Sequence, residues 1–196
     1  MAEKFKILVA DKLAPEGLKF IEDQPDCELV NKPGLSEDDY MQLADECDAM
    51  LVRSGIKVTP KIMSSAKKLK VIARAGVGVD NIDLKAATDK GILVLNSAEA
   101  STISTAEHAF TLMMALCRNV GIAHLTVANG GWDRNKFNGI TLEGKTLAIV
   151  GFGRIGQTIA KRAFAFGMDV IAYDPFINAA TMLDGKVKMF TDFKEI

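Results

Sequence analysis

The feature that most restricts the fold is a glycine-rich junction within residues 146–174, TLAIVGFGRIGQTIAKRAFAFGMDVIAYD. A run of β-favouring residues is followed by three glycines in the spacing GxGxxG, namely Gly151, Gly153 and Gly156. A helical pattern follows and ends at Gly167, and a second β-rich run (169–173) leads to Asp174. This order of strand, glycine turn, helix, strand and acid predicts a βαβ unit with parallel strands.

The three glycines meet the requirements of a dinucleotide-binding turn. Gly151 permits a tight turn, Gly153 lets a pyrophosphate approach the backbone, and Gly156 lets the helix pack closely on the strand. The spacing alone is a weak signal, but here a strand precedes it, a helix follows it and a second strand ends in an acid. The alternative is a glycine-rich turn that binds no ligand.

The residues around the turn indicate which dinucleotide it would bind. A pyrophosphate would lie at the start of the helix, at Arg154 and Ile155, where backbone N–H groups and the helix dipole favour an anion. Asp174 would accept hydrogen bonds from the adenosine ribose and would repel a 2′-phosphate. The sequence therefore predicts NAD as the cofactor, in preference to NADP.

The rest of the chain predicts a second α/β unit upstream. Short β-rich runs alternate with helical patterns, and the predicted strands lie at 6–10, 28–31, 49–53, 71–74 and 92–96. The predicted fold class is α/β with two doubly wound parallel-sheet lobes. Residues 1–98 would form a flavodoxin-like substrate-binding lobe, and residues 99–196 the first part of an incomplete NAD-binding Rossmann domain.

Two helices are predicted at the start of the second lobe. Residues 101–118 carry apolar side chains at helical spacing, which predicts a long and well-buried helix. A second helix is predicted over 122–129 and ends at Gly130 and Gly131. Asp192 would open a further helix close to residue 196.

The composition excludes several classes of function. The 24 basic and 25 acidic residues nearly balance and form no basic stripe, so nothing predicts nucleic-acid binding. No apolar run approaches the ~20 residues that span a membrane, and the N-terminus lacks the anatomy of a signal peptide. The three cysteines have no metal-type spacing, which predicts reduced thiols, a cytoplasmic location and no metal site.

The motifs along the chain resemble those of the D-isomer-specific 2-hydroxyacid dehydrogenases. Besides the glycine unit, these are LVRSGIKVT (51–59), RAGVGVDNIDLKAATDKGILVLN (74–96), STAEH (104–108) and GITLEGKTLAIVG (139–151). They occur in the family's order, and the resemblance covers essentially the whole chain. It implies an NAD-dependent oxidoreductase. The segment WDRNKFNG (132–139) favours a member acting on a phosphorylated hydroxy acid over members using glyoxylate, formate or lactate.

Two arginines are the main candidates for binding the substrate. Arg53 and Arg74 each end a predicted parallel strand, and ligands of open α/β sheets bind at the carboxyl ends of strands. A guanidinium binds carboxylate and phosphate groups with two parallel hydrogen bonds. The resemblance implies substrate binding for both residues. The alternative for each is an ion pair at the protein surface.

The resemblance implies further site residues near these arginines. Gly76 and Gly78 would present backbone amides to the substrate carboxylate, and Val77 would touch the cofactor. Arg134 would supply another cation for the substrate phosphate; the alternative is a polar turn with no ligand.

The resemblance also implies that the catalytic groups lie outside this chain. In the family, a histidine backed by a glutamate transfers the proton and an arginine orients the carboxylate, all beyond residue 196 in this numbering. His108 and His124 lie in predicted helices, so neither is assigned a catalytic role, and Glu107 is expected to serve helix packing. We therefore expect this chain alone to be inactive and to provide no catalytic residue.

Other readings of the same sequence stay open. The family's cofactor domain forms the dimer interface, so the complete protein is expected to be a homo-oligomer, a dimer or a tetramer.

A related dehydrogenase of the glyoxylate or hydroxypyruvate type would share most of these motifs. So would an NAD-sensing binding protein of the corepressor type, or a fragment that only binds anions through Arg53 and Arg74.

Overall fold

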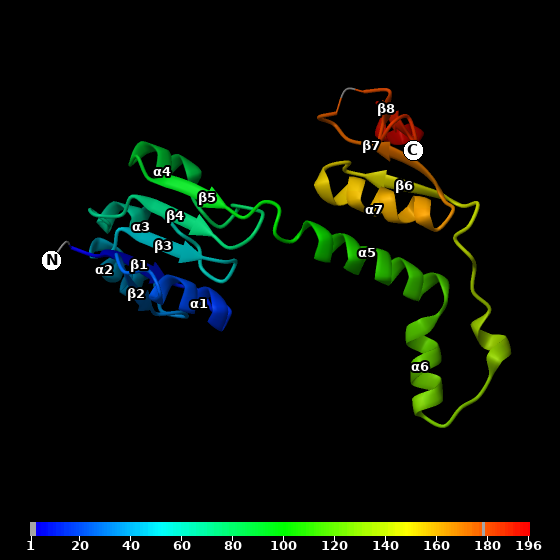
Figure 1. Cartoon of the computed structure of the whole chain (residues 1–196), viewed down its shortest axis with the longest axis horizontal. Coiled ribbons are helices and arrows are strands. Elements are labelled where there is room, and N and C mark those ends of the chain that lie inside the picture. Colours follow the sequence, from blue (N-terminus) through cyan, green and yellow to red (C-terminus); the bar gives the residue numbers. More distant parts are fainter. Residues whose placement is uncertain (1–2, 178) are drawn as a thin grey trace. The chain divides into compact units, whose positions relative to one another are not determined.

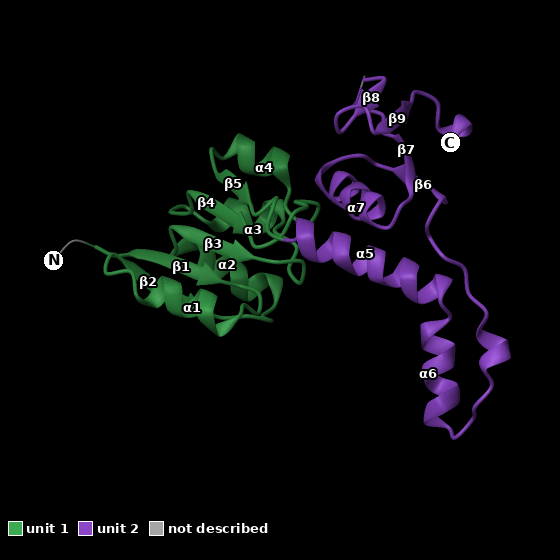
Figure 2. Ribbon diagram, turned by 45° about the vertical axis from the view of Figure 1, so that its right-hand side comes forward, with its two compact units in different colours: residues 1–100 green, residues 101–196 purple. Residues whose placement is uncertain are grey.

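The computed structural model describes residues 3–177 and 179–196. The chain separates into two compact units, Met1–Ala100 and Ser101–Ile196 (Figure 2). Each unit has its own sheet and its own apolar core. The predicted α/β class is therefore confirmed, and each unit is described by itself.

The first unit is built on a five-stranded parallel sheet in the order β2-β1-β3-β4-β5. Its strands are β1 Phe5–Val9, β2 Cys27–Asn31, β3 Ala49–Val52, β4 Val71–Arg74 and β5 Leu93–Asn96. Its helices are α1 Pro15–Glu22, α2 Glu37–Asp45, α3 Pro60–Ser65 and α4 Leu84–Asp89. This strand order is doubly wound, and the order reverses between β1 and β3, where such folds bind ligands.

The helices of the first unit cover the sheet in two layers (Figure 1). Helices α2, α3 and α4 pack on one face. Their buried side chains, such as Tyr40 and Ile62, form the core with strand residues such as Met50 and Ile72. Helix α1 lies on the other face. Ser36, Thr59 and Asp83 cap the helices that follow them through their side-chain oxygens. Because the strands are parallel, the loops that follow them lie at the same edge of the sheet.

The second unit carries a mixed four-stranded sheet in the order β6-β7-β9-β8. Its elements are α5 Thr102–Cys117, α6 Val120–Ala128, the 3₁₀ helix η1 Arg134–Phe137, β6 Thr146–Val150, α7 Arg154–Ala165, β7 Asp169–Tyr173, β8 Thr181–Met182, β9 Val187–Phe190 and the 3₁₀ helix η2 Phe193–Glu195. Strands β6 and β7 are parallel, as predicted, and β9 pairs parallel with β7. Strand β8 was not predicted and pairs antiparallel with β9.

The short strand β8 exists because of the turn that follows it. Leu183, Asp184 and Gly185 all have positive φ angles, 52°, 58° and 80°, which reverses the chain between β8 and β9. Only two residues of β8 pair with β9, so no alternating pattern was present to predict a strand. At Asp192, where the sequence predicted the start of a helix, the structure has the single 3₁₀ turn η2, capped by the Asp192 side chain.

Helix α5 is less buried than its sequence predicts. Ala106 and Phe110 are buried against the rest of the unit, but Leu112 and Leu116 are 57% and 80% exposed. Helix α5 packs on α7 along one face (Figure 1). Its apolar residues on other faces remain at the surface. Periodicity identified the helix, but it did not show that apolar residues extend beyond the face that α7 covers.

Within the described residues, no single helix has the length and apolar character to cross a membrane. Helices α5 and α6 meet that test only when taken together, and the chain bends by 65° between them.

Candidate functional site

The glycine turn joins β6 to α7, and two of its glycines are required by the geometry. Gly151 has a φ of +92°, where a side chain would be strained, and its N–H donates to the carbonyl of Tyr173 at 2.8 Å. A Cβ on Gly156 would collide with the carbonyl oxygen of Gly151 and would lie 3.2 Å from Cγ2 of Ile149. Helix and strand therefore approach as closely as the GxGxxG pattern predicts.

Gly153 differs from the other two glycines of the turn. It is the N-cap of α7 and has an ordinary φ of −71°. Apart from its own neighbours in the chain, no described residue has a heavy atom within 4 Å of the place where its Cβ would be. The space in front of this residue is therefore open, and the protein's own packing gives no reason for a glycine here. The GxGxxG pattern predicts that a ligand approaches the backbone at this point.

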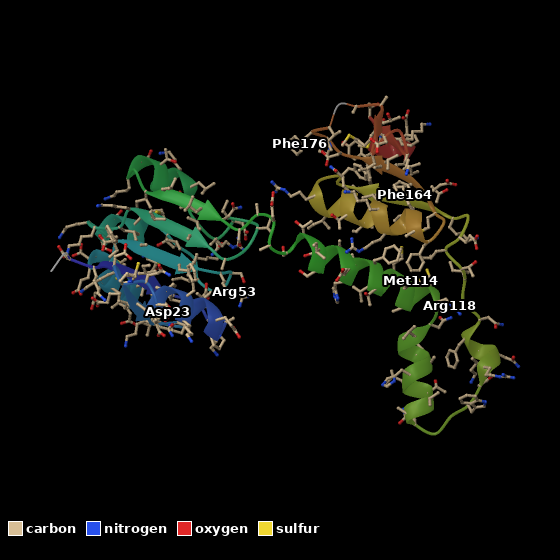
Figure 3. All side chains as sticks on the ribbon, in the orientation of Figure 1. Asp23, Arg53, Met114, Arg118, Phe164 and Phe176 are labelled. Atoms are coloured by element: carbon tan, nitrogen blue, oxygen red, sulfur yellow. The ribbon has the colours of Figure 1, made fainter. Side chains whose placement is uncertain are left out.

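Asp174 follows β7 and is tied to the glycine turn. Its Oδ2 accepts the N–H of Phe152 at 2.8 Å, and its Oδ1 accepts the N–H of Phe176 at 2.9 Å. Each carboxylate oxygen has a further lone pair for a ligand hydroxyl. Phe176 itself is 94% exposed (Figure 3). Asp174 thus has two roles in the geometry, holding the turn and presenting acceptors beside it.

These residues fit the adenosine half of a dinucleotide. The first intrahelical bond of α7 runs from the N–H of Gln157 to the carbonyl of Gly153 at 3.0 Å, so the helix opens directly at the turn. Arg154 and Ile155 form the first turn of this helix, where the dipole favours a phosphate. Such a ligand requires three features: open space at the turn, a helix N-terminus for the pyrophosphate and an acid at the end of the next strand for the ribose. Gly153, α7 and Asp174 provide them.

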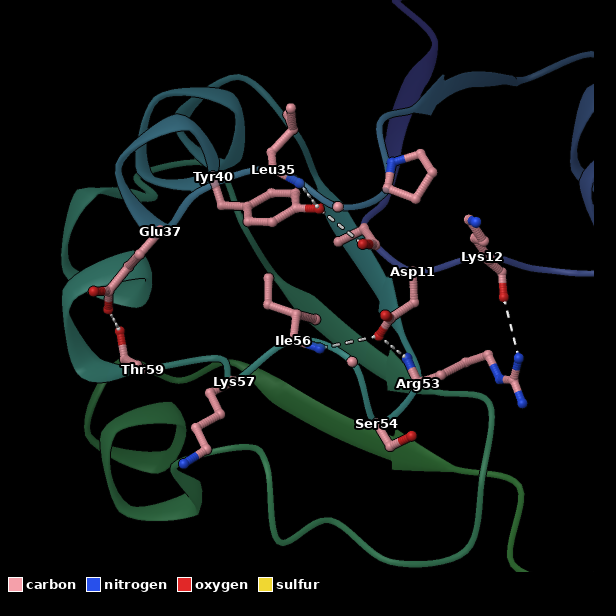
Figure 4. Close-up of a pocket in the computed structure, with 14 residues that line it drawn as sticks. Asp11, Lys12, Leu35, Glu37, Tyr40, Arg53, Ser54, Ile56, Lys57 and Thr59 are labelled. Atoms are coloured by element: carbon pink, nitrogen blue, oxygen red, sulfur yellow. Dashed lines mark hydrogen bonds between the residues drawn. The ribbon is translucent and has the colours of Figure 1, made fainter.

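A second candidate site lies in the first unit, at the carboxyl ends of its strands. A cavity of about 710 Å³ is lined by the loops that follow β1, β2 and β3 (Figure 4). Its cationic side chains are Lys12, Arg53 and Lys57. Arg53 directly follows β3, and its Nη1 donates to the carbonyl of Lys12 at 3.3 Å. The arginine predicted at this strand end therefore lies beside a cavity large enough for a small anion.

Arg74 is held differently from Arg53. Its side chain is only 11% exposed, and its Nη1 donates to Oδ1 of Asp80 at 2.7 Å. A Cβ on Gly78 would lie 2.8 Å from that carboxylate oxygen and 3.2 Å from Nη1, so the loop passes directly over the guanidinium. The hydrogen bond from Arg74 lowers the pKa of the Asp80 carboxyl below its ordinary value of 3.8. Arg74 thus fixes the loop that carries Gly76 and Gly78.

The remaining predicted site residues lie at the surface of one unit or the other. Val77 is 41% exposed, and its carbonyl accepts Nδ2 of Asn96 at 2.5 Å. Arg134 begins η1 in the second unit, whereas Arg53 and Arg74 belong to the first.

The two histidines and Glu107 of the second unit are not part of the glycine turn. His108 and His124 lie exposed on α5 and α6. The carboxylate of Glu107 accepts Nη2 of Arg162 at 2.8 Å, which links α5 to α7, in line with the packing role expected for it. In the part of the chain that the structure describes, no group of three His, Cys, Asp or Glu side chains is arranged to hold a metal ion.

Sequence reasoning missed two residues that organise the turn after β3. Asp11 accepts N–H groups of this turn, and Asn81 donates to its carbonyl groups. Both lie far from Arg53 in the sequence, and no local pattern signals such contacts. An aspartate directly after a buried strand was the only available sign.

Comparison with known proteins identifies the class to which the chain belongs. Residues 7–191 match the catalytic domain of the D-isomer specific 2-hydroxyacid dehydrogenases, and the chain is a member of that family. The D-3-phosphoglycerate dehydrogenase of Methanocaldococcus jannaschii is 46% identical over 191 residues, 97% of this chain and 36% of that protein. The enzyme of the same name from Archaeoglobus fulgidus is 44% identical over 173 residues, 88% of this chain and 33% of that protein. The chain thus spans about a third of these relatives.

A solved structure agrees with this assignment. The NAD-dependent formate dehydrogenase from Staphylococcus aureus, determined in complex with NAD, superposes with a TM-score of 0.81 at 28% identity. The match covers 97% of this chain and 61% of that protein. The fold is therefore shared with a family member whose solved structure contains NAD.

Proposed function

We propose that the protein oxidises D-3-phosphoglycerate to 3-phosphohydroxypyruvate with NAD, the first step of the phosphorylated route to serine. The observation that carries the proposal is the identity of 46% over nearly the whole chain to a relative of that name. The glycine turn and the arginine-bearing cavity supply sites of suitable chemistry for the cofactor and the anionic substrate.

The cofactor site of the proposal lies at the turn between β6 and α7. Gly151, Gly153 and Gly156 would shape the turn, while Arg154 and Ile155 would begin the helix that faces the pyrophosphate. Asp174 would bind the adenosine ribose hydroxyls and select NAD over NADP. When bound, NAD supplies the acceptor for a hydride. This chain's residues bind and orient its adenosine half.

The substrate site of the proposal begins at Arg53. Its guanidinium would bind the carboxylate or phosphate of the substrate, in a cavity where Lys12 and Lys57 add positive charge. Gly76, Val77 and Gly78 would lie on the loop that meets substrate and cofactor, and Arg74 would hold that loop through Asp80. Arg134 would supply a further cation.

Calorimetry on the purified chain tests both sites. We expect NAD to bind more tightly than NADP, and D-3-phosphoglycerate to bind more tightly than glyoxylate. Arg53→Ala should weaken D-3-phosphoglycerate binding about tenfold, because a charge-assisted contact is lost. Lys67→Ala removes an exposed cation from the same unit and is the matched control. Equal binding of D-3-phosphoglycerate by the Arg53→Ala variant would reject the substrate site.

Self-association is the second part of the proposal. Helix α6 has no buried residue, and Val120, Ile122, Leu125 and Val127 on it are 52–64% exposed. A helix with apolar residues on all faces is stable in water only when a partner covers it. We therefore propose that the protein is a homo-oligomer in which α6 is buried against a second copy.

The proposed location is the cytoplasm. Cys27, Cys47 and Cys117 are free thiols, as expected in a reducing compartment. Burial raises the pKa of Cys47, which keeps that thiol protonated and unreactive.

A further inference from the structure

Arg53 opens a four-residue turn, residues 53–56, whose N–H groups are held by one side chain. Oδ2 of Asp11, two residues after the end of β1, accepts the N–H of Arg53 at 2.6 Å and the N–H of Ile56 at 3.4 Å (Figure 4). A Cβ on Gly55 would collide with the other carboxylate oxygen of Asp11. The turn therefore wraps tightly around this carboxylate.

The carbonyl groups of the same two residues are held by another side chain. Nδ2 of Asn81 donates to the carbonyls of Arg53 and Ile56, both at 2.7 Å. The backbone of Asn81 is fixed in turn, because its carbonyl accepts the N–H of Val58 at 2.8 Å. Its Oδ1 is buried without a hydrogen-bond partner among the described residues. The described hydrogen bonds of the Asn81 side chain are therefore the two that Nδ2 donates to this turn. Both ends of the turn are thus bonded from outside, through their N–H and their C=O groups.

Asp11 is an acid beside an expected anion site, which argues that its role is to position the turn that carries Arg53. A carboxylate beside an anion site weakens anion binding through repulsion, and Asp11 lines the cavity with Arg53. Its presence is explained by the two N–H groups that it accepts. Without Asp11 and Asn81, the turn would lose four hydrogen bonds, and the backbone that carries the Arg53 side chain would no longer be fixed at residues 53 and 56.

We propose that Asp11 and Asn81 are positioning residues that hold Arg53 in the orientation that binds the substrate anion. The proposal rests on the function proposed above, because it requires Arg53 to contact that anion. Neither residue needs to touch the substrate. Their effect is exerted through the backbone of residues 53–56.

The test is calorimetric titration of the full chain with D-3-phosphoglycerate and, separately, with NAD. Asp11→Ala and Asn81→Ala should each weaken D-3-phosphoglycerate binding about tenfold and leave NAD binding in the second unit unchanged. Asp11→Asn keeps an oxygen that accepts the Arg53 N–H and removes the negative charge, so it should bind within about threefold of the wild type. Asn119→Ala is the matched control, because Nδ2 of Asn119 donates to the carbonyl of Asn138 in the second unit.

The outcomes separate this proposal from the function on which it rests. If Arg53→Ala leaves D-3-phosphoglycerate binding unchanged, the substrate site itself is wrong. If Arg53→Ala weakens binding but Asp11→Ala and Asn81→Ala do not, the positioning role is overturned. Equal losses in Asp11→Ala and Asp11→Asn would also overturn it, since the contact would then depend on charge. Should Asn81→Ala fail to fold, the two Asp11 variants still decide the question.

A spectroscopic readout adds a signature that a purely structural role would not move. In the wild type, the Arg53 Nε–H resonance should shift when D-3-phosphoglycerate is added. In Asp11→Ala the shift at saturation should be smaller, while Asp11→Asn should restore it. An unchanged shift in Asp11→Ala would show that the orientation of Arg53 does not depend on Asp11.

Discussion

At the scale of single residues, the glycines of one turn are expected to respond differently to the same substitution. Gly156→Ala places a Cβ against the carbonyl of Gly151, so it should lower the free energy of unfolding by about 1–3 kcal/mol. Gly153→Ala meets no described atom apart from its neighbours in the chain, so it should leave stability nearly unchanged while weakening NAD binding. Urea unfolding and calorimetry with NAD measure the two effects. Equal NAD affinity in Gly153→Ala and the wild type would contradict the assigned cofactor approach.

A second residue-scale prediction concerns pH and the pair formed by Arg74 and Asp80. Because the pKa of Asp80 is lowered in the folded state, the pair stabilises the loop above the unfolded-state pKa. That contribution is lost as the pH falls through the lower, folded-state value. The carboxyl carbon of Asp80, followed by NMR, should therefore titrate with a midpoint below 3.8. In an Arg74→Gln variant the midpoint should rise; an unchanged midpoint would remove Arg74 as the cause.

At the scale of secondary-structure elements, α6 carries the clearest expectation. Leu125→Lys puts a charge on its exposed apolar surface and should shift the chain toward monomer in sedimentation experiments. His124→Lys adds a charge at an exposed polar position of the same helix and serves as the control. If both variants sediment like the wild type, another surface mediates association, or the chain is monomeric.

The elements also show how far the sequence determines the structure. Helices were predicted where periodicity and glycine stops agree, as in α6 before Gly130 and α7 before Gly167. Burial of α5 was predicted wrongly, because periodicity does not reveal which apolar faces have a neighbour. Strand β8 escaped prediction because its pairing depends on three consecutive positive φ angles. The contacts of Asp11 and Asn81 escaped because they join residues 42 and 28 positions from Arg53.

At the scale of the whole molecule, two separate cores predict two separable unfolding events. The first core lies between the sheet β2-β1-β3-β4-β5 and helices α2 to α4, and the second joins α5, α7 and the sheet of β6, β7 and β9. A ligand that binds one folded unit stabilises that unit, by about 2.7 kcal/mol at a concentration of about 100 times Kd. NAD should therefore raise the melting temperature of the second unit alone, and D-3-phosphoglycerate that of the first. Differential scanning calorimetry, with Trp132 fluorescence reporting the second unit, resolves the two transitions. A single transition that both ligands raise equally would mean that the two units unfold as one cooperative body, and the separate assignment of substrate and cofactor sites would then need to be tested by mutation alone.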